Sequence, residues 1–181
     1  MVATVHPSKA DCRGDVNGNA RGLSRFARIV GAPVAPTRDR LILTAHSGGG
    51  MPAVDTLSGA AHPPDELHFF DALYGRDPRA GDPLGGLDIL DRWLGDRLAG
   101  EPGQPGALRV VYIEGETGRY SRAVGEAIAR HLATADPALR PMLARRYRIE
   151  RSFVPHSHVA MQAGPSLLAA AEADIAWWEG P

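Results

Sequence analysis

The sequence predicts an α/β fold, with a mostly parallel sheet of about four strands and helices on both faces. Short apolar segments alternate along the 181-residue chain with longer segments of helical periodicity, the pattern of strands joined by crossover helices. The segment Leu41–Thr44 is an apolar run, typical of a strand buried on both faces of a parallel sheet. Reactive side chains follow several of the predicted strands, at the sheet edge where ligands bind.

Each predicted element is supported by its own pattern of residues. The predicted strands are short apolar runs bounded by turn residues: Leu41–Thr44, Glu66–Phe70, Leu108–Ile113 and Tyr147–Val154. A helix of about ten residues is expected after Ser47, where Pro52 suits a first helical turn. The other predicted helices carry apolar residues on one face or follow a proline: Leu23–Val30, Leu84–Leu98, Ser121–Ala133 and Pro165 to about Ala176.

Length and composition predict one domain over residues 23–181, preceded by a polar, irregular segment over residues 1–22. Asp15–Asn19 resembles the start of a calcium loop, but Phe26 stands where the bidentate glutamate belongs, so we expect a plain turn. With 20 basic and 21 acidic residues, the net charge of −1 gives no electrostatic reason to expect nucleic acid or an anionic membrane as a partner.

Cysteine content and hydropathy indicate whether the chain can form disulfides, cross a membrane or carry a signal peptide. Cys12 is the only cysteine, so no disulfide can form within the chain. No apolar run approaches the roughly 20 residues of a membrane span. Residues 1–20 lack the apolar core of a signal peptide, so we expect a cytoplasmic protein.

The most informative local feature is the turn that follows the first predicted strand. Ala45-His46-Ser47-Gly48-Gly49 has the small-x-Ser-x-small pattern of a nucleophile elbow, a strained turn that exposes its serine at a strand end. The small residues two before and two after Ser47 leave room for neighbouring backbone. The Gly48 N–H would point to a developing oxyanion. The alternative is a glycine-rich turn with Ser47 as a helix N-cap.

Five reactive residues directly follow predicted strands, and in a parallel sheet these positions share one edge. They are Ser47, Asp71, Glu114, Glu116 and His156. Their positions after the strands are enough to bring a nucleophile, acids and a base to the same edge of the sheet. His46, inside the elbow, is expected to pack, and His62, His68 and His131 are expected to be structural or exposed.

Three motifs resemble the α/β-hydrolase superfamily, whose chain order is serine, acid, histidine. They are Ala45–Gly49, Phe70–Gly75 and Val154–His156, and they are similar to a group of bacterial hydrolase-like proteins with an AHSGG elbow, a DALYG or DSLYG strand end and a late PHG-type histidine. The resemblance covers roughly residues 20 to 170 and corresponds to the carboxyl-terminal half of the hydrolase fold.

The resemblance implies a role for each site residue. Ser47 would attack a carbonyl carbon and His156 would accept its proton. Asp71 would orient the imidazole, with Glu114 or Glu116 as the alternative acid. His158 is the alternative base, because residues 156 and 158 would face the same side of an extended segment. A His-x-His pair could also supply two ligands to a zinc ion. Two histidines alone do not complete a zinc site, so no metal or cofactor is expected.

The chain departs from the hydrolase fold in front of the elbow. No strand is predicted there, so the turn that normally supplies the second oxyanion N–H is missing, and Leu41–Thr44 would form an uncovered apolar edge. The chain would then be a fragment, a truncation or a homo-oligomer. Two functions follow: a serine hydrolase acting on a small or polymer-borne ester or amide, and a catalytically inactive binding or assembly module.

Overall fold

The computed structural model describes residues 2–5, 41–58, 63–74, 84–99 and 106–178 of the chain. Within these ranges five strands form one sheet, in which every neighbouring pair is parallel. The strands are β1 (Val2–Val5), β2 (Ile42–His46), β3 (Glu66–Phe70), β4 (Ala107–Ile113) and β5 (Tyr147–Ser152). They lie in the sheet in the order of the sequence.

The register brings the carboxyl ends of the strands to one edge. His46, the last residue of β2, lies opposite Phe70, the last residue of β3. Ile113 at the end of β4 lies opposite Ser152 at the end of β5. The turns that leave β2, β3 and β4 therefore begin side by side, as the sequence predicts for a parallel sheet.

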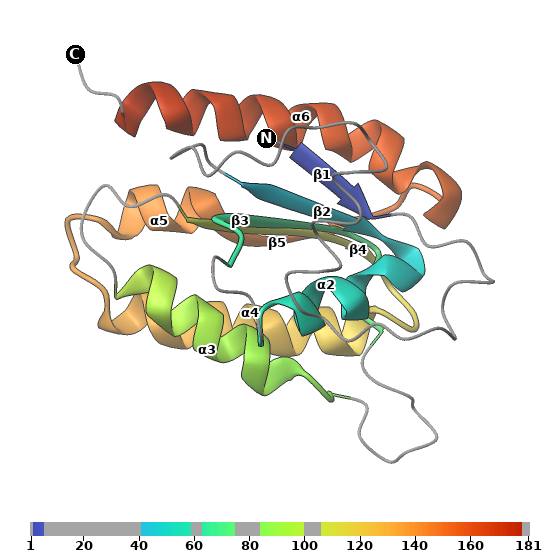
Figure 1. Ribbon diagram of the computed structural model, residues 1–181, viewed down its shortest axis with the longest axis horizontal. Helices are drawn as coiled ribbons and strands as arrows, with labels where there is room; N and C mark the ends of the chain where they lie inside the picture. The colour runs from blue at the N-terminus through green and yellow to red at the C-terminus, as the bar shows by residue number, and fades with distance from the viewer. Residues whose placement is uncertain (1, 6–40, 59–62, 75–83, 100–105, 179–181) are drawn as a thin grey trace.

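Helices cover both faces of the sheet, as Figure 1 shows. One face carries α2 (Gly50–Thr56), α3 (Leu87–Leu98) and α4 (Gly118–Thr134), and the other carries the long helix α6 (His156–Trp178). The short 3-10 helix η2 (Ser47–Gly49) leads from β2 into α2, and α5 (Arg140–Arg146) precedes β5. The α/β class, the parallel sheet and the helices on both faces are thus confirmed.

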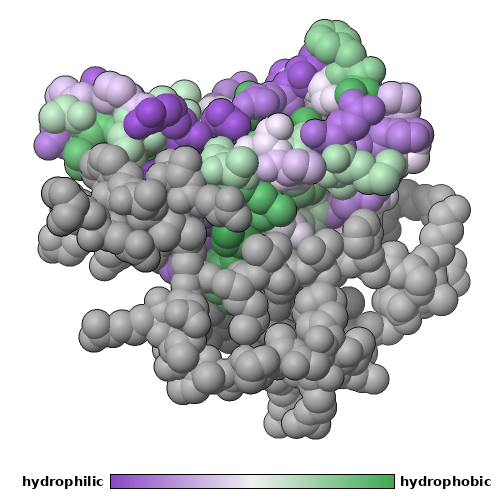
Figure 2. Space-filling view, turned by 90° about the horizontal axis from the view of Figure 1, so that it is seen from above, coloured by the Kyte–Doolittle hydropathy of each residue, from purple (hydrophilic) through white to green (hydrophobic). Residues whose placement is uncertain are grey.

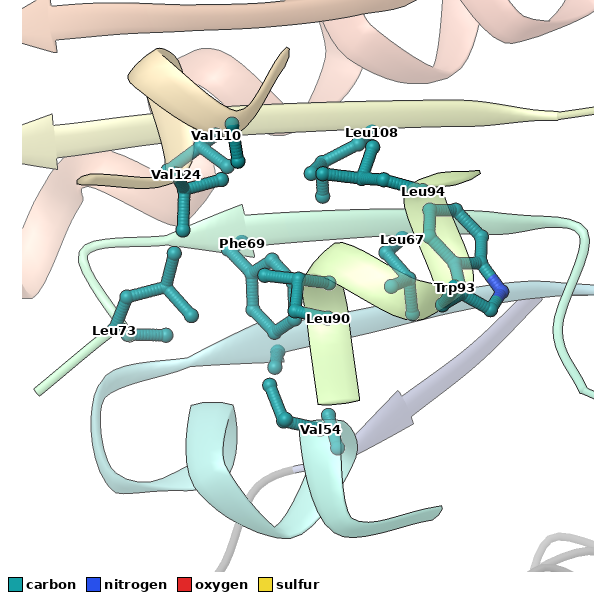
Figure 3. Close-up of a cluster of buried hydrophobic side chains, with 14 of the residues drawn as sticks. Val54, Leu67, Phe69, Leu73, Leu90, Trp93, Leu94, Leu108, Val110 and Val124 are labelled. Carbon is teal, nitrogen blue, oxygen red and sulfur yellow. The ribbon is translucent and has the colours of Figure 1, made fainter. Parts of the chain in front are cut away.

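The larger hydrophobic core lies between the sheet and the face of α2, α3 and α4. Alternate strand residues point into it, because successive side chains of a strand face opposite sides. Figure 3 shows the strand side chains meeting those of the helices: Val54, Leu67, Phe69, Leu73, Leu90, Trp93, Leu94, Leu108, Val110 and Val124. Burying a leucine such as Leu90 completely is worth roughly 1.5–3 kcal/mol, so this face anchors the fold.

A smaller core lies under α6. Phe70 of β3 and Val111 of β4 pack there against Val159 and Leu167 of the helix. On this side of the molecule, hydrophilic and hydrophobic residues are interspersed over the described surface (Figure 2). The helix thus covers strand ends with few apolar contacts, and its first residue reaches the edge of the sheet.

The four predicted strands and the helices between them are confirmed, and the differences lie at their ends. Helix α6 begins at His156, nine residues before the predicted start at Pro165, which lies inside the helix. A proline lacks the N–H of an interior helical position, so its presence misplaced the predicted boundary. Helix α5 was not predicted, since its seven residues carry little apolar periodicity.

The strand β1 corrects the sequence analysis of the amino-terminal segment. Val2–Val5 pairs in parallel with β2, with Val2 opposite Ile42 and Val5 opposite Ala45. A strand therefore does precede the elbow, and the prediction of an irregular segment is wrong for these residues. Because β1 covers β2, the argument for a second copy along an uncovered Leu41–Thr44 edge falls away.

Other expectations concern residues outside the described ranges. The rest of the segment 1–22, the helix over Leu23–Val30, the calcium-loop residues from Asp15 to Phe26, and His62 all lie there.

Candidate active site

The elbow at Ser47 has the backbone that a nucleophile turn requires. Ser47 follows β2 directly and has a φ of 53°, in the left-handed region that non-glycine residues rarely adopt. Such a conformation costs roughly 1–3 kcal/mol and persists where the surroundings enforce it. Gly50 lets this turn approach the neighbouring segment closely, because a Cβ there would lie 1.9 Å from the carbonyl oxygen of Ala72. The turn after β2 is therefore packed directly against the segment that follows β3.

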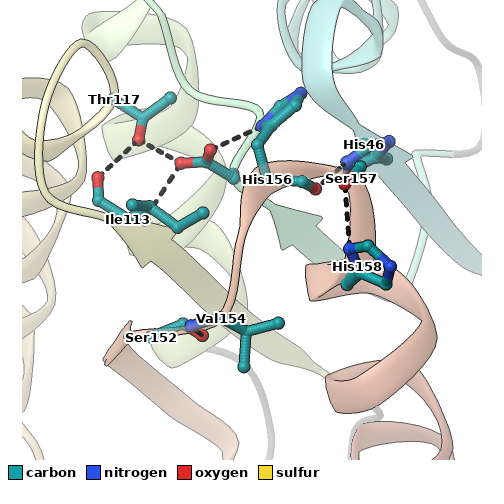
Figure 4. Close-up of polar contacts among 9 residues, drawn as sticks. His46, Ile113, Thr117, Ser152, Val154, His156, Ser157 and His158 are labelled. Carbon is teal, nitrogen blue, oxygen red and sulfur yellow. Dashed lines mark hydrogen bonds and ion pairs between the residues drawn. The ribbon is translucent and has the colours of Figure 1, made fainter.

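Asp71 is the first residue after β3 and is fixed from several sides. Its φ of 46° is also left-handed. Its N–H donates to the Val111 carbonyl at 2.7 Å, and its Oδ1 accepts from the Ile113 N–H at 3.0 Å. The Thr117 hydroxyl donates to the same oxygen. These contacts hold a carboxylate that is only 8% exposed in one orientation, and Figure 4 shows those made by Ile113 and Thr117.

The second oxygen of Asp71 binds His156. Its Oδ2 lies 2.6 Å from His156 Nδ1, a charge-assisted distance. A carboxylate only accepts, so Nδ1 carries the hydrogen, and in the neutral imidazole Nε2 is then a lone-pair base. The His156 side chain is 42% exposed, so this base faces solvent at the sheet edge. The predicted acid and the predicted base are thus in direct contact.

His46 holds the other side of His156. The two imidazole rings stack with their centroids 4.7 Å apart and an angle of 27° between their planes. His46 Nε2 lies 3.0 Å from the carbonyl oxygen of His156, and it donates, since a carbonyl only accepts. His46 packs, as expected, but against the candidate base. This ties the elbow to the first residue of α6.

Ser47 therefore lies one residue from the ring that stacks on His156. Its side chain lies within hydrogen-bonding reach of the Tyr74 hydroxyl. Within the described residues no hydrogen bond joins Ser47 to His156. Burial raises the pKa of Tyr74, hydrogen bonding to Ser47 partly offsets this, and the negative charges of Asp71 and Glu116 raise it further. The Tyr74 hydroxyl consequently stays protonated at neutral pH.

The alternative acids lie elsewhere on the rim. Glu114 is exposed, binds Arg122 at 2.5 Å and lies 3.8 Å from Arg151. The hydrogen bond from Arg122 lowers the pKa of Glu114. Glu116 is also exposed. Asp71, not either glutamate, is the acid bonded to the candidate base.

The alternative base His158 does not share the position of His156. Its Nδ1 lies 2.9 Å from the Ser157 hydroxyl, and its side chain is exposed. Residues 156 and 158 belong to the first turn of α6, where positions two apart point to different sides. The expectation that they face the same side fails because the segment is helical, not extended.

Several contributors to the site escaped the sequence analysis. Thr117 and the Ile113 N–H bind Asp71, and Tyr74 binds Ser47. Tyr74 lies in the DALYG motif, and Thr117 follows the Glu114–Glu116 segment. Their positions shortly after predicted strands could therefore have indicated that both residues belong to the site. Gly48, the proposed oxyanion donor, is exposed next to Ser47.

Metal centres and membrane-spanning helices can be assessed only for the residues that the structure describes. Among them, no group of three or more histidine, cysteine, aspartate or glutamate residues is arranged to hold a metal ion. None of the helices in these ranges combines the length and hydropathy needed to cross a membrane.

Comparison with protein-family models, with curated proteins and with solved structures returned no match for this chain. The geometry at the sheet edge is therefore what indicates a function for this chain.

Proposed function

We propose that this chain is a serine hydrolase that cleaves an ester or amide bond with Ser47 as nucleophile, His156 as base and Asp71 as orienting acid. The observation that carries the proposal is the 2.6 Å hydrogen bond between Asp71 and His156 beside a serine with left-handed φ. A buried carboxylate bonded to a solvent-facing imidazole next to a strained serine is the arrangement that nucleophilic acyl transfer requires.

The reaction would proceed through an acyl-enzyme. Ser47 Oγ attacks the substrate carbonyl carbon while its proton passes to His156 Nε2, and the carbonyl oxygen becomes an oxyanion. The oxyanion then re-forms the carbonyl, the bond to the leaving group breaks, and His156 returns the proton to that group. Water repeats the sequence: it loses a proton to His156, attacks the acyl carbon and releases the acid with Ser47 restored.

Asp71 supports each step in which His156 becomes positively charged. Its Oδ2 accepts the Nδ1 hydrogen throughout, which keeps Nε2 available and stabilises the imidazolium. The Ile113 N–H and the Thr117 hydroxyl on its other oxygen keep the carboxylate in place. The Gly48 N–H is proposed as one donor to the oxyanion.

Catalysis requires a change in the position of the Ser47 side chain. Its Oγ must come within hydrogen-bond reach of His156 Nε2, whereas in the resting structure it is within reach of the Tyr74 hydroxyl. Catalytic hydrogen bonds commonly tighten only when substrate is bound. The 42% exposure of His156 favours an open site suited to small or polymer-borne acyl groups.

The lack of a Ser47–His156 hydrogen bond within the described residues favours one rival function. In that case the chain is an α/β-hydrolase-like binding or assembly module that keeps the elbow without the chemistry. The two functions make opposite predictions for covalent labelling.

A fluorophosphonate probe tests the proposal directly, because it phosphonylates a serine activated by a base. We expect the wild-type protein to be labelled and Ser47→Ala to lose all labelling. Ser157→Ala is the matched control, since Ser157 is an exposed serine 2.9 Å from His158 Nδ1 and should label like wild type. If Ser157→Ala lost labelling while Ser47→Ala kept it, Ser157 and not Ser47 would be the nucleophile. An unlabelled wild-type protein would favour the inactive module.

A further inference from the structure

The oxyanion in the proposed reaction needs a second donor beside the Gly48 N–H. Removing one such donor from an acyl-transfer enzyme costs roughly 10²–10³ in rate. The search for this donor begins at Ser47, because the oxyanion is bonded to the carbon that Ser47 Oγ attacks. A group that reaches Ser47 Oγ in the resting state is therefore close to the position where the oxyanion forms.

Tyr74 is such a group, and its segment is held firmly against the elbow. β3 lies next to β2, with Phe70 opposite His46, so the residues after each strand are neighbours. The contact between Gly50 and Ala72 is so close that a single methyl group would not fit. Ala72 and Leu73 are 1% and 0% exposed, so the chain leading to Tyr74 is anchored in the core.

The Tyr74 hydroxyl is chemically a donor under working conditions. It is half-buried and lies within hydrogen-bonding reach of Ser47. Burial is the main cause that raises its pKa, and the carboxylates of Asp71 and Glu116 act in the same direction. A phenol that keeps its proton can donate to a developing negative charge, and the partial burial strengthens that hydrogen bond.

We propose that the Tyr74 hydroxyl is the second oxyanion donor and acts together with the Gly48 N–H. In the resting state the hydroxyl is paired with Ser47. When Ser47 Oγ bonds to the substrate carbon, the hydroxyl turns to the new oxyanion, and Ser47 Oγ is released toward His156. This inference rests on the proposed hydrolase function, and it makes Tyr74 a catalytic residue that contacts the reacting atoms.

The test compares steady-state hydrolysis of p-nitrophenyl acetate by wild type, Tyr74→Phe and Tyr147→Phe. Removing the hydroxyl of Tyr74 should lower kcat by about 100-fold and leave KM within about twofold, because the donor acts mainly in the transition state. Tyr147→Phe is the matched control, since Tyr147 begins β5 at the opposite edge of the sheet and should keep wild-type kcat. Thermal unfolding followed by circular dichroism checks that the variants are folded.

A second measurement separates an oxyanion role from a structural one. Phenylboronic acid forms a tetrahedral adduct with a nucleophilic serine and places a hydroxyl where the oxyanion would lie. Its inhibition constant should rise in Tyr74→Phe by a factor similar to the loss in kcat. A kcat within threefold of wild type, or an unchanged boronate affinity, overturns the role of Tyr74 and leaves the hydrolase proposal standing. A wild-type protein that neither hydrolyses the ester nor accepts the fluorophosphonate overturns both.

Discussion

Among the described residues, one histidine–carboxylate pair lies at the carboxyl edge of the sheet and another lies within the sheet, and their N–O distances are similar. His156 Nδ1 lies 2.6 Å from Asp71, and His68 Nε2 lies 3.0 Å from Glu66. Their surroundings differ. His156 is 42% exposed at the carboxyl edge, whereas both side chains of the Glu66–His68 pair are completely buried.

The partners of each carboxylate explain the difference. Arg109, opposite His68 in the sheet register, donates to Glu66 at 2.6 Å, and its Nη1 lies 3.1 Å from His68 Nε2. A buried cation therefore compensates the charge of this carboxylate and lies beside the histidine nitrogen that contacts it. Asp71 is held instead by neutral donors, the Ile113 N–H and the Thr117 hydroxyl.

This contrast shows that a short histidine–carboxylate distance does not by itself identify a catalytic pair. The His156 side chain is 42% exposed, so in the proposed reaction its Nε2 is available to take up and return a proton. The Glu66–His68–Arg109 cluster is a buried ion network, so His68, expected to be structural or exposed, is buried. Each pair can be broken separately, and the two should fail in different ways.

The largest effect is expected from Asp71→Asn. The asparagine no longer enforces the catalytic tautomer of His156 or stabilises its positive charge, so kcat should fall by roughly 10⁴, or about 5 kcal/mol. Glu66→Gln is the matched control with the same chemical change in the buried pair. Its kcat per folded molecule should stay within about threefold of wild type. Equal losses of kcat in the two variants would contradict the distinction between the pairs.

A smaller effect, on stability, is expected from Arg109→Met. Removing the cation leaves Glu66 buried without its partner, which should lower the free energy of unfolding by roughly 3–5 kcal/mol in guanidinium chloride titrations. Arg130→Met is the control, because Arg130 is 60% exposed beside Asp91 and such surface pairs contribute about 0–1 kcal/mol. A loss no greater than that of the control would show that the network does not support the fold.

The smallest effect is expected from Glu114→Gln. Glu114 does not bind the candidate base, so kcat should stay within about twofold of wild type. The hydrogen bond from Arg122 lowers the pKa of Glu114 in the folded protein, so its slight stabilisation is present at neutral pH. That stabilisation is lost as pH falls through the lowered pKa. Melting temperatures of wild type and Glu114→Gln should therefore converge in acid, and a large fall in kcat would instead make Glu114 the catalytic acid.

Local patterns were enough to predict much of the site. The apolar run before Ser47, the small residues around it and the strand that ends at Phe70 placed the elbow and Asp71 at one edge. They succeeded because strand alternation and turn chemistry are short-range properties, and because parallel strands bring their carboxyl ends together. The same reasoning failed for His158, since it required knowing that α6 starts at His156.

The sequence by itself determined the α/β class, the four strands β2 to β5 and the residues offered at their carboxyl ends. Only the tertiary structure decided that Asp71 binds His156, that Glu114 turns to Arg122, and that Val2–Val5 covers the edge of β2. Periodicity reports which side of an element is buried. It does not report which of several polar groups, distant in sequence, meet across the gap between elements, because that depends on packing and register throughout the sheet.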